Sequence, residues 1–311
     1  MNQILTALWP VFTLLCLGYG IKRIGFPGPG FWEPAEKLIY FMLFPVLLVY
    51  KLSLADISAV PLWEVASAII GLLLIGTILL LSIQRIRPMP SAGFTSVYQG
   101  GMRFNTYVGL AACAALYGDA SLAIAAVVLA VMVPLLNLLC VLIFSIYTRR
   151  DGGVRSTLMA VLKNPLILAC VIGISLNLTG LGLPLAIESV AALLSSMALP
   201  LGLLAVGAGL NLNALRNAGG AVLYSSVIKL LLFPLIMMLI CYLYIDLYSV
   251  AAVLVLFSAL PTASTAYILA RQLGGDAPMM AAIITSQTLL SFVTMPVVLM
   301  IFTTFFKNGS I

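Results

Sequence analysis

Apolar runs of about twenty residues follow one another along almost the whole chain, separated by short segments rich in glycine and proline. A run of this length is what an α-helix needs to cross the hydrocarbon core of a bilayer. Of the 311 residues, 63% are hydrophobic and only 8% are charged, whereas soluble domains carry about 25% charged residues. The sequence therefore predicts an all-α polytopic membrane protein that is embedded in the lipid bilayer and has no separate soluble domain.

The length fits about ten spanning helices joined by short loops. The expected loops are marked by glycine and proline at turns, for example in residues 25–30 and 180–184. The ten expected spans cover residues 3–21, 36–52, 63–84, 92–117, 121–147, 162–179, 188–211, 220–244, 248–273 and 277–306.

Basic residues are distributed unevenly between the expected loops. The even-numbered loops and the C-terminal tail together hold two, Lys51 and Lys307, and the odd-numbered loops hold eleven. The eleven are Lys22, Arg23, Lys37, Arg85, Arg87, Arg149, Arg150, Arg155, Lys163, Arg216 and Arg271. Because cytoplasmic loops are enriched in lysine and arginine, we expect a multi-pass protein of the cell membrane with both termini outside the cytoplasm. This topology accounts for the net charge of +6, so nucleic-acid binding is not expected.

Two apolar segments in different halves of the chain carry matching interruptions. The first, residues 99–119, is interrupted after Arg103, and the second, residues 260–276, is interrupted at Pro261. Laid over each other without a gap, both segments end in Leu-x-Gly-Asp. Paired interrupted segments of this kind indicate the substrate site of a secondary transporter. We therefore expect the two segments to cross near the membrane midplane and to bind an organic anion there.

The two halves of the chain also match outside these segments. Each carries a proline about nine residues into a span, Pro45 and Pro200, followed by a leucine-rich run. Five spans in each half is an odd number, so the halves must have opposite orientations in the membrane. Residues 1–150 are therefore expected to form a first five-helix repeat and residues 164–311 a second, inverted one, with residues 151–163 as a cytoplasmic linker.

The interruptions are expected to bind an anion largely through backbone groups. Half-helices that begin near Asn105 and Thr262 present N–H groups without intrahelical partners, and their dipoles place partial positive charge at the crossing. Backbone groups of this kind are tolerated in lipid where they line a polar cavity. The side chains expected in the substrate-binding site beside these N–H groups are Asn105, Thr106, Pro261, Thr262, Ser264 and Thr265.

Arg103 and Lys229 are the two basic residues expected within spans. A charge at that depth costs about 2.5–3.5 kcal/mol on insertion scales, so a functional role is the first hypothesis. We expect Arg103 to be the charge partner of the anion; the alternative is a structural arginine that pairs with backbone carbonyls or reaches the membrane surface. Lys229 either contributes to the site or has a structural role, and the sequence leaves both alternatives open. Gln287 and Asn137 either line the cavity or form interhelical hydrogen bonds.

Other kinds of chemistry find little support in the sequence. Histidine is absent and no carboxylate lies deep in an expected span, which argues against a proton relay of Asp, Glu and His. The five cysteines stand singly in apolar runs, so neither a metal site nor a cofactor is expected. An intramembrane enzyme is not expected for the same reasons. A channel is poorly matched by the paired interruptions, and the length leaves no room for a receptor's signalling domain.

Three stretches resemble the bacterial members of the auxin efflux carrier family, which includes the plant PIN carriers and bacterial malonate and malate permeases. They are residues 101–111 with the motif Arg-Phe-Asn-Thr, residues 197–204 and residues 260–267, and the resemblance extends over essentially the whole chain. It implies ten transmembrane helices in two inverted five-helix repeats, with crossed, broken helices 4 and 9. This is the fold of bile-acid sodium symporters and sodium–proton antiporters. Organic anions are the family's cargo, and a homodimer is its expected assembly.

The sequence departs from the plant carriers at the first break and between the repeats. The plant carriers have proline at both breaks, whereas here Asn105-Thr106 occupies the first, and their long cytoplasmic loop is missing. The expected function is transport of a small organic anion, a mono- or dicarboxylate, by an elevator or rocking form of alternating access. Potential-driven efflux or uniport is the simplest drive, since one charge gains about 2.3 kcal/mol per 100 mV. The alternative is a sodium- or proton-coupled carboxylate symporter.

Overall fold

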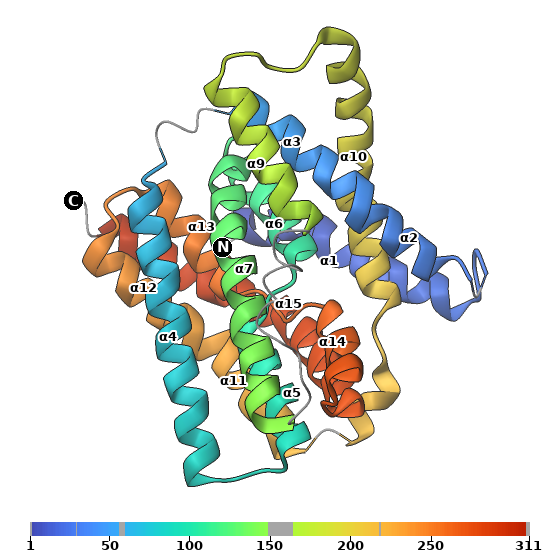
Figure 1. Ribbon diagram of the computed structural model, residues 1–311, viewed down its shortest axis with the longest axis vertical. Helices are drawn as coiled ribbons and strands as arrows, with labels where there is room; N and C mark the ends of the chain where they lie inside the picture. Colours follow the sequence, from blue (N-terminus) through green and yellow to red (C-terminus); the bar gives the residue numbers. More distant parts are fainter. Residues whose placement is uncertain (1, 29, 56–59, 149–163, 218, 309–311) are drawn as a thin grey trace. The chain divides into compact units, whose positions relative to one another are not determined.

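The computed structural model describes residues 2–28, 30–55, 60–148, 164–217 and 219–308 (Figure 1). Within these ranges every regular element is a helix and no strand occurs. Seven helices are long and apolar enough to cross a membrane: Gln3–Arg23, Trp32–Leu54, Leu62–Ile86, Ser121–Thr148, Leu185–Ala208, Gly220–Tyr244 and Ala277–Phe306. The prediction of an all-α polytopic membrane protein is confirmed. The expected linker 151–163 lies outside the described residues, and the ten spans and the inverted repeat stay predictions.

The chain forms two compact units, and each unit collects stretches from both halves of the sequence. Unit 1 consists of Met1–Leu62, Tyr107–Ala130 and Ala160–Gly209. Unit 2 consists of Trp63–Thr106, Val131–Met159 and Leu210–Ile311. The division into units therefore does not follow the boundary between the two expected repeats near residue 150.

Unit 1 is built on two close pairs of helices. Its elements are α1 (Asn2–Arg23), α2 (Trp32–Leu38), η1 (Ile39–Leu43), α3 (Phe44–Leu54), α9 (Pro165–Leu178), α10 (Leu185–Ala208), nearly all of α6 (Thr106–Tyr117) and the first part of α7 (Ser121–Thr148). Helix α1 packs against α10, and α3 packs against α9. A Cβ atom on Gly18 would overlap the carbonyl oxygen of Leu204, and one on Gly207 would overlap that of Leu15. The motif Leu-x-x-Gly on each helix thus lets the two backbones touch.

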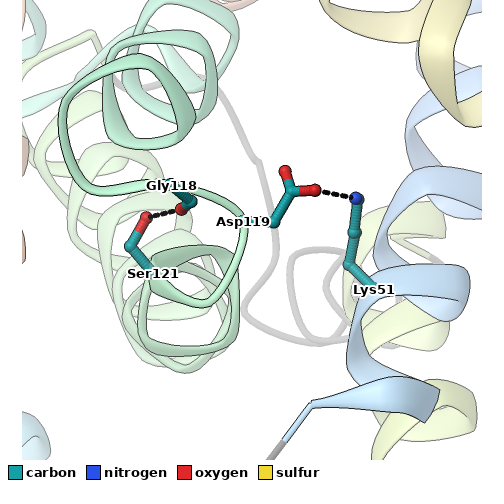
Figure 2. A network of polar contacts seen from close by, with 4 residues as sticks. All are labelled: Lys51, Gly118, Asp119 and Ser121. Atoms are coloured by element: carbon teal, nitrogen blue, oxygen red, sulfur yellow. Dashed lines mark hydrogen bonds and ion pairs between the residues drawn. The ribbon is translucent and has the colours of Figure 1, made fainter.

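An ion pair fastens the turn between α6 and α7 to the end of α3 in unit 1 (Figure 2). Lys51 Nζ lies 2.6 Å from Asp119 Oδ2, and within the turn Ser121 Oγ donates to the carbonyl oxygen of Gly118 at 2.6 Å. The charge of Lys51, the basic residue found in an even-numbered loop, is therefore balanced within the protein.

Unit 2 has two helices that are buried on nearly all sides. Its elements are α4 (Leu62–Ile86), α5 (Ser91–Met102), the second part of α7, η2 (Leu212–Asn217), α11 (Gly220–Val227), η3 (Ile228–Leu232), α12 (Phe233–Tyr244), α13 (Tyr248–Ser258), α14 (Thr265–Leu273) and α15 (Ala277–Asn308). In α5 every residue from Gly93 to Met102 is buried, and in α13 every residue from Val250 to Ser258 is buried. A helix that is buried all round is a core helix, so these two helices form the interior of unit 2.

A widened helical turn precedes a Phe-Pro pair in each unit. In η1 the N–H of Phe44 bonds to the carbonyl of Ile39, and in η3 the N–H of Phe233 bonds to that of Ile228. Proline has no N–H and disrupts the regular ladder of a helix, and single π-turns are frequent where the ladder must be rearranged. The turn in unit 2 carries Lys229.

Candidate substrate-binding site

The first interruption separates α5 from α6. Helix α5 ends at Met102, and Arg103 has an extended backbone with φ −71° and ψ 160°. Its N–H still donates to the carbonyl oxygen of Gln99 at 2.8 Å, and α6 begins at Thr106. The break predicted after Arg103 is confirmed, and it is three residues long.

The second interruption separates α13 from α14 and covers residues 259–264. Pro261 lies within it, as expected. Thr262 is fully buried; its N–H donates to Gln287 Oε1 at 2.9 Å, and its hydroxyl approaches the carbonyl oxygen of Gln99 at 3.5 Å. Helix α14 begins at Thr265. The buried N–H of Thr262 at this break is therefore paired by a side chain of another helix.

The two breaks contact each other within unit 2. The N–H of Asn105 donates to the carbonyl oxygen of Pro261 at 2.8 Å. Gln287, fully buried on α15, connects the same region: its Nε2 donates to the carbonyl oxygen of Gly100 at 2.9 Å and to Ser225 Oγ at 3.2 Å. Gln287 thus forms the interhelical hydrogen bonds that were one of its two expected roles, and both of its N–H groups are occupied by protein atoms.

Arg103 keeps an unused donor inside the protein. Its side chain is half-buried, and Nη1 is buried without a hydrogen-bond partner. The guanidinium interacts with the thiol of Cys140 on α7, and neither ion pair found among the described residues involves it. The structure therefore leaves Arg103 with a positive charge and a donor that no carboxylate of the described residues satisfies.

The remaining predicted site residues differ in exposure. Asn105 is buried, Thr106 and Ser264 are half-buried, and Thr265 is exposed. The hydroxyl oxygen of Ser264 has no hydrogen-bond partner. Asn137 is half-buried on α7, one turn before Cys140. Because residues three apart share a face of a helix, Asn137 lies on the side of α7 that interacts with Arg103.

Sequence reasoning missed two residues of this region, Gln99 and Ser225. The side chain of Gln99 is fully buried, and neither its oxygen nor its nitrogen has a partner. Ser225 on α11 accepts from Gln287 and donates to the carbonyl oxygen of Val97 at 3.4 Å. The signal for Gln99 is a polar residue one turn before Arg103 in an apolar segment. For Ser225 it is a serine one turn before Lys229.

The charges of unit 2 favour a negative ligand at the breaks. Its described carboxylates are Glu64, Asp246 and Asp276, and all three lie at or beside helix ends. Asp276 caps α15 by accepting the N–H of Met279 at 2.9 Å. Inside the unit the polar atoms without a hydrogen-bond partner include Arg103 Nη1 and Lys229 Nζ. A buried region with cations and donors but no described buried carboxylate can bind an anion without like-charge repulsion.

Seven membrane-length apolar helices define a multi-pass helical membrane protein. Two interrupted helices whose breaks meet in one unit are typical of secondary transporters. The sequence model of the family described as membrane transport protein matches residues 153–299. This is the family of the auxin efflux carriers, so the predicted family resemblance is confirmed over residues 153–299. The family consists of transporters rather than enzymes. No curated protein matches the chain significantly.

Proposed function

We propose that the protein carries a small organic anion, a mono- or dicarboxylate, across the cell membrane by alternating access. The observation that carries this proposal is the contact between the breaks, where Asn105 bonds to Pro261 beside an arginine with an unused buried donor. The family relationship of residues 153–299 supports transport as the activity. An anion is proposed as the substrate because the interior of unit 2 holds basic side chains and no described buried carboxylate.

Residues of unit 2 have distinct roles in this proposal. Arg103 is the charge partner of a carboxylate, and hydroxyl groups such as that of Ser264 and the amide of Gln99 supply further hydrogen bonds. Gln287 holds the second break in position, because its N–H groups are already used by Gly100 and Ser225. An anion bound at the breaks then moves with unit 2, in an elevator or rocking movement that exposes the site to one side of the membrane at a time.

Two driving forces are open to such a carrier. A bound monoanion that crosses with no other charge is driven by the membrane potential, at about 2.3 kcal/mol per 100 mV, which favours efflux from a cell that is negative inside. Symport with a cation is the second candidate, and the buried, unpartnered Lys229 favours a proton as that cation. Extracytoplasmic termini and a homodimer complete the proposal.

A thermal-shift screen tests anion binding. Purified protein is heated with acetate, malonate, malate, benzoate or indole-3-acetate, and with malonamide as an uncharged match for malonate. We expect at least one carboxylate to raise the melting temperature, and malonamide to leave it unchanged.

Two arginine variants give the matched comparison. Arg103→Ala should lose the shift while it stays folded, whereas Arg216→Ala, which removes an exposed arginine of the same unit, should keep it. A carboxylate shift of equal size in Arg103→Ala and in the wild type would contradict the proposed site. The absence of a shift with every carboxylate would contradict the proposed function.

A further inference from the structure

Lys229 is completely buried, and its amine has no hydrogen-bond partner, which is unusual for a charged residue. Its exposed fraction is 0%, and its Nζ has no hydrogen-bond partner. It lies on the widened turn η3, and Nζ is 5.4 Å from the centroid of the Phe233 ring, one turn further along. Lysine is almost never fully buried unless it is paired, so the site around it needs an explanation.

No acidic side chain comes from the helices packed against η3. These helices are α5, α11, α12 and α15, and their sequences contain no aspartate or glutamate. Their titratable side chains are Tyr98, Tyr224, Cys241, Tyr242, Tyr244 and Lys307. The hydroxyl of Tyr98 bonds to Thr77 at 2.9 Å and that of Tyr224 accepts from Arg87 at 2.7 Å. Arg103, which follows α5, adds a further cation, so the described residues of these helices offer Lys229 no counter-charge.

A protonated Lys229 is costly as long as no counter-ion is near. Removal of an ammonium group from water costs several kcal/mol even after the protein relaxes, and contact with an aromatic ring returns about 0.5–2 kcal/mol. A neutral amine avoids this cost. An anion inside unit 2 supplies the missing counter-charge, so binding of the anion and binding of a proton at Lys229 favour each other by the same factor.

A short series of hydrogen bonds connects the second break to Ser225, a neighbour of Lys229 along the helix. Ser225 lies one turn before Lys229, and both side chains are buried on the inner side of the helix. Ser225 Oγ accepts from Gln287 Nε2 at 3.2 Å, and Gln287 Oε1 accepts the N–H of Thr262 at 2.9 Å. The hydrogen bonds of the second break thus extend to Ser225, one helical turn before Lys229.

We propose that Lys229 is the proton-carrying residue of this transporter. Its amine takes up one proton from water when an organic anion binds at the breaks, and it returns that proton to water when the anion leaves on the other side. This inference rests on the proposed function and names the proton as its coupling ion. A monoanion and its proton cross together without net charge, so the flux responds to a pH difference and not to the membrane potential.

The first experiment measures proton uptake on binding. Purified protein in weakly buffered detergent solution with a pH indicator is mixed with malonate, and with each carboxylate that gave a thermal shift, all adjusted to the same pH. The wild type should take up about one proton for each bound anion. Lys229→Met, which has a similar length but no titratable group, should take up none. It should also melt at a higher temperature than the empty wild type, because a buried unpaired amine is removed.

Two further variants serve as controls. Lys51→Met removes a lysine that is paired with Asp119 and should keep the proton uptake of the wild type. Lys229→Arg keeps a permanent charge, so it should bind the anion without proton uptake, and its flux in proteoliposomes should respond to a potential imposed with valinomycin.

The outcomes separate this inference from the function on which it rests. If the wild type binds a carboxylate without proton uptake, or if both Lys229 variants take up a proton as the wild type does, the inference is wrong and the proposed function stands. If no carboxylate of the panel binds, the proposed function is wrong and the inference falls with it. Even if a variant does not fold, proton uptake by the wild type still tests the inference, because binding without uptake contradicts it.

Discussion

The two units differ in what they bury. Seventeen polar or charged side chains are buried among the described residues, and thirteen of them lie in unit 2. The four of unit 1 are Ser53, Ser121, Asn164 and Ser195. Within the described ranges, the buried side-chain atoms without a hydrogen-bond partner all lie in unit 2 and belong to Gln99, Arg103, Lys229, Ser264 and Thr294.

This difference separates a unit held together by packing from a unit with unpaired buried polar groups. An unsatisfied buried polar group costs about 1–3 kcal/mol, so several of them in one region need a reason, and the proposed function gives one. Unit 1 instead brings backbones into contact at Gly18 and Gly207. Stability is therefore expected to depend on shape in unit 1 and on hydrogen bonds in unit 2.

The largest expected effect is in unit 1. Gly18→Ala places a methyl group against the backbone of Leu204 and should lower the free energy of unfolding by about 3 kcal/mol, as measured by unfolding with sodium dodecyl sulfate in mixed micelles. Gly20→Ala on the same helix, where an added Cβ would have no neighbouring atom within 4 Å, should change the free energy of unfolding little. The carboxylate-induced thermal shift should survive in both variants. Equal stability of the two variants would contradict the packing argument.

In unit 2, Gln287→Leu should lower the free energy of unfolding slightly less than Gly18→Ala does in unit 1. Unlike Gly18→Ala, it should abolish carboxylate binding. The change leaves the N–H of Thr262 and the carbonyl of Gly100 without their partner, at a cost of about 2–3 kcal/mol in total. Thr288→Val is the control, because the Thr288 hydroxyl bonds to Ile284 of its own helix. It should cost less than about 1 kcal/mol and keep the thermal shift. A folded Gln287→Leu protein with an unchanged carboxylate shift would show that the breaks do not need this residue.

The contact between the breaks can be tested through one backbone N–H. Asn105→Pro removes the donor to Pro261, while Asn105→Ala keeps it. We expect Asn105→Pro to be less stable than Asn105→Ala by about 1–2 kcal/mol in the same unfolding assay. If the proline variant is as stable as the alanine variant, the break tolerates the residue found in the plant carriers and the hydrogen bond contributes little.

The smallest effect is expected for the ion pair of unit 1. Lys51→Met should lower the free energy of unfolding by at most about 1 kcal/mol, because Asp119 is largely exposed and exposed pairs contribute little. The difference from the wild type should shrink in 1 M salt, where charges are screened. A double-mutant cycle with Asp119→Asn measures the pair itself. A coupling energy above about 2 kcal/mol would show that polar contacts stabilise unit 1 as strongly as packing does.

The positions of the breaks could be predicted from the sequence because their signals are local. Arg103 and Pro261 each interrupt an apolar segment, and a proline also restricts the residue before it. Their lengths could not be predicted. The gapless alignment pairs Thr106, where α6 begins, with Ala263, yet α14 begins at Thr265. The second break is therefore longer, and the N–H of Thr262 within it pairs with Gln287, a residue from another helix.

Contacts between distant segments were the part that the sequence did not reveal. Gln287 could have lined a cavity or bonded to other helices, and the packing of α5, α11 and α15 around it decides for the hydrogen bonds. Gln99 was only the first residue of the segment 99–119 in the sequence. Its full burial follows from the position of α5 in the core of unit 2. Gly18 was one of 25 glycines, and its importance depends on a partner helix nearly two hundred residues away.

The interleaved composition of the two units has a consequence for biogenesis. Each unit takes stretches from before residue 131 and from after residue 159, so neither can be completed while the early helices alone have left the ribosome. The first helices must wait in the bilayer, partly uncovered, until their later neighbours are inserted. A chain stopped midway thus yields two incomplete assemblies instead of one finished half.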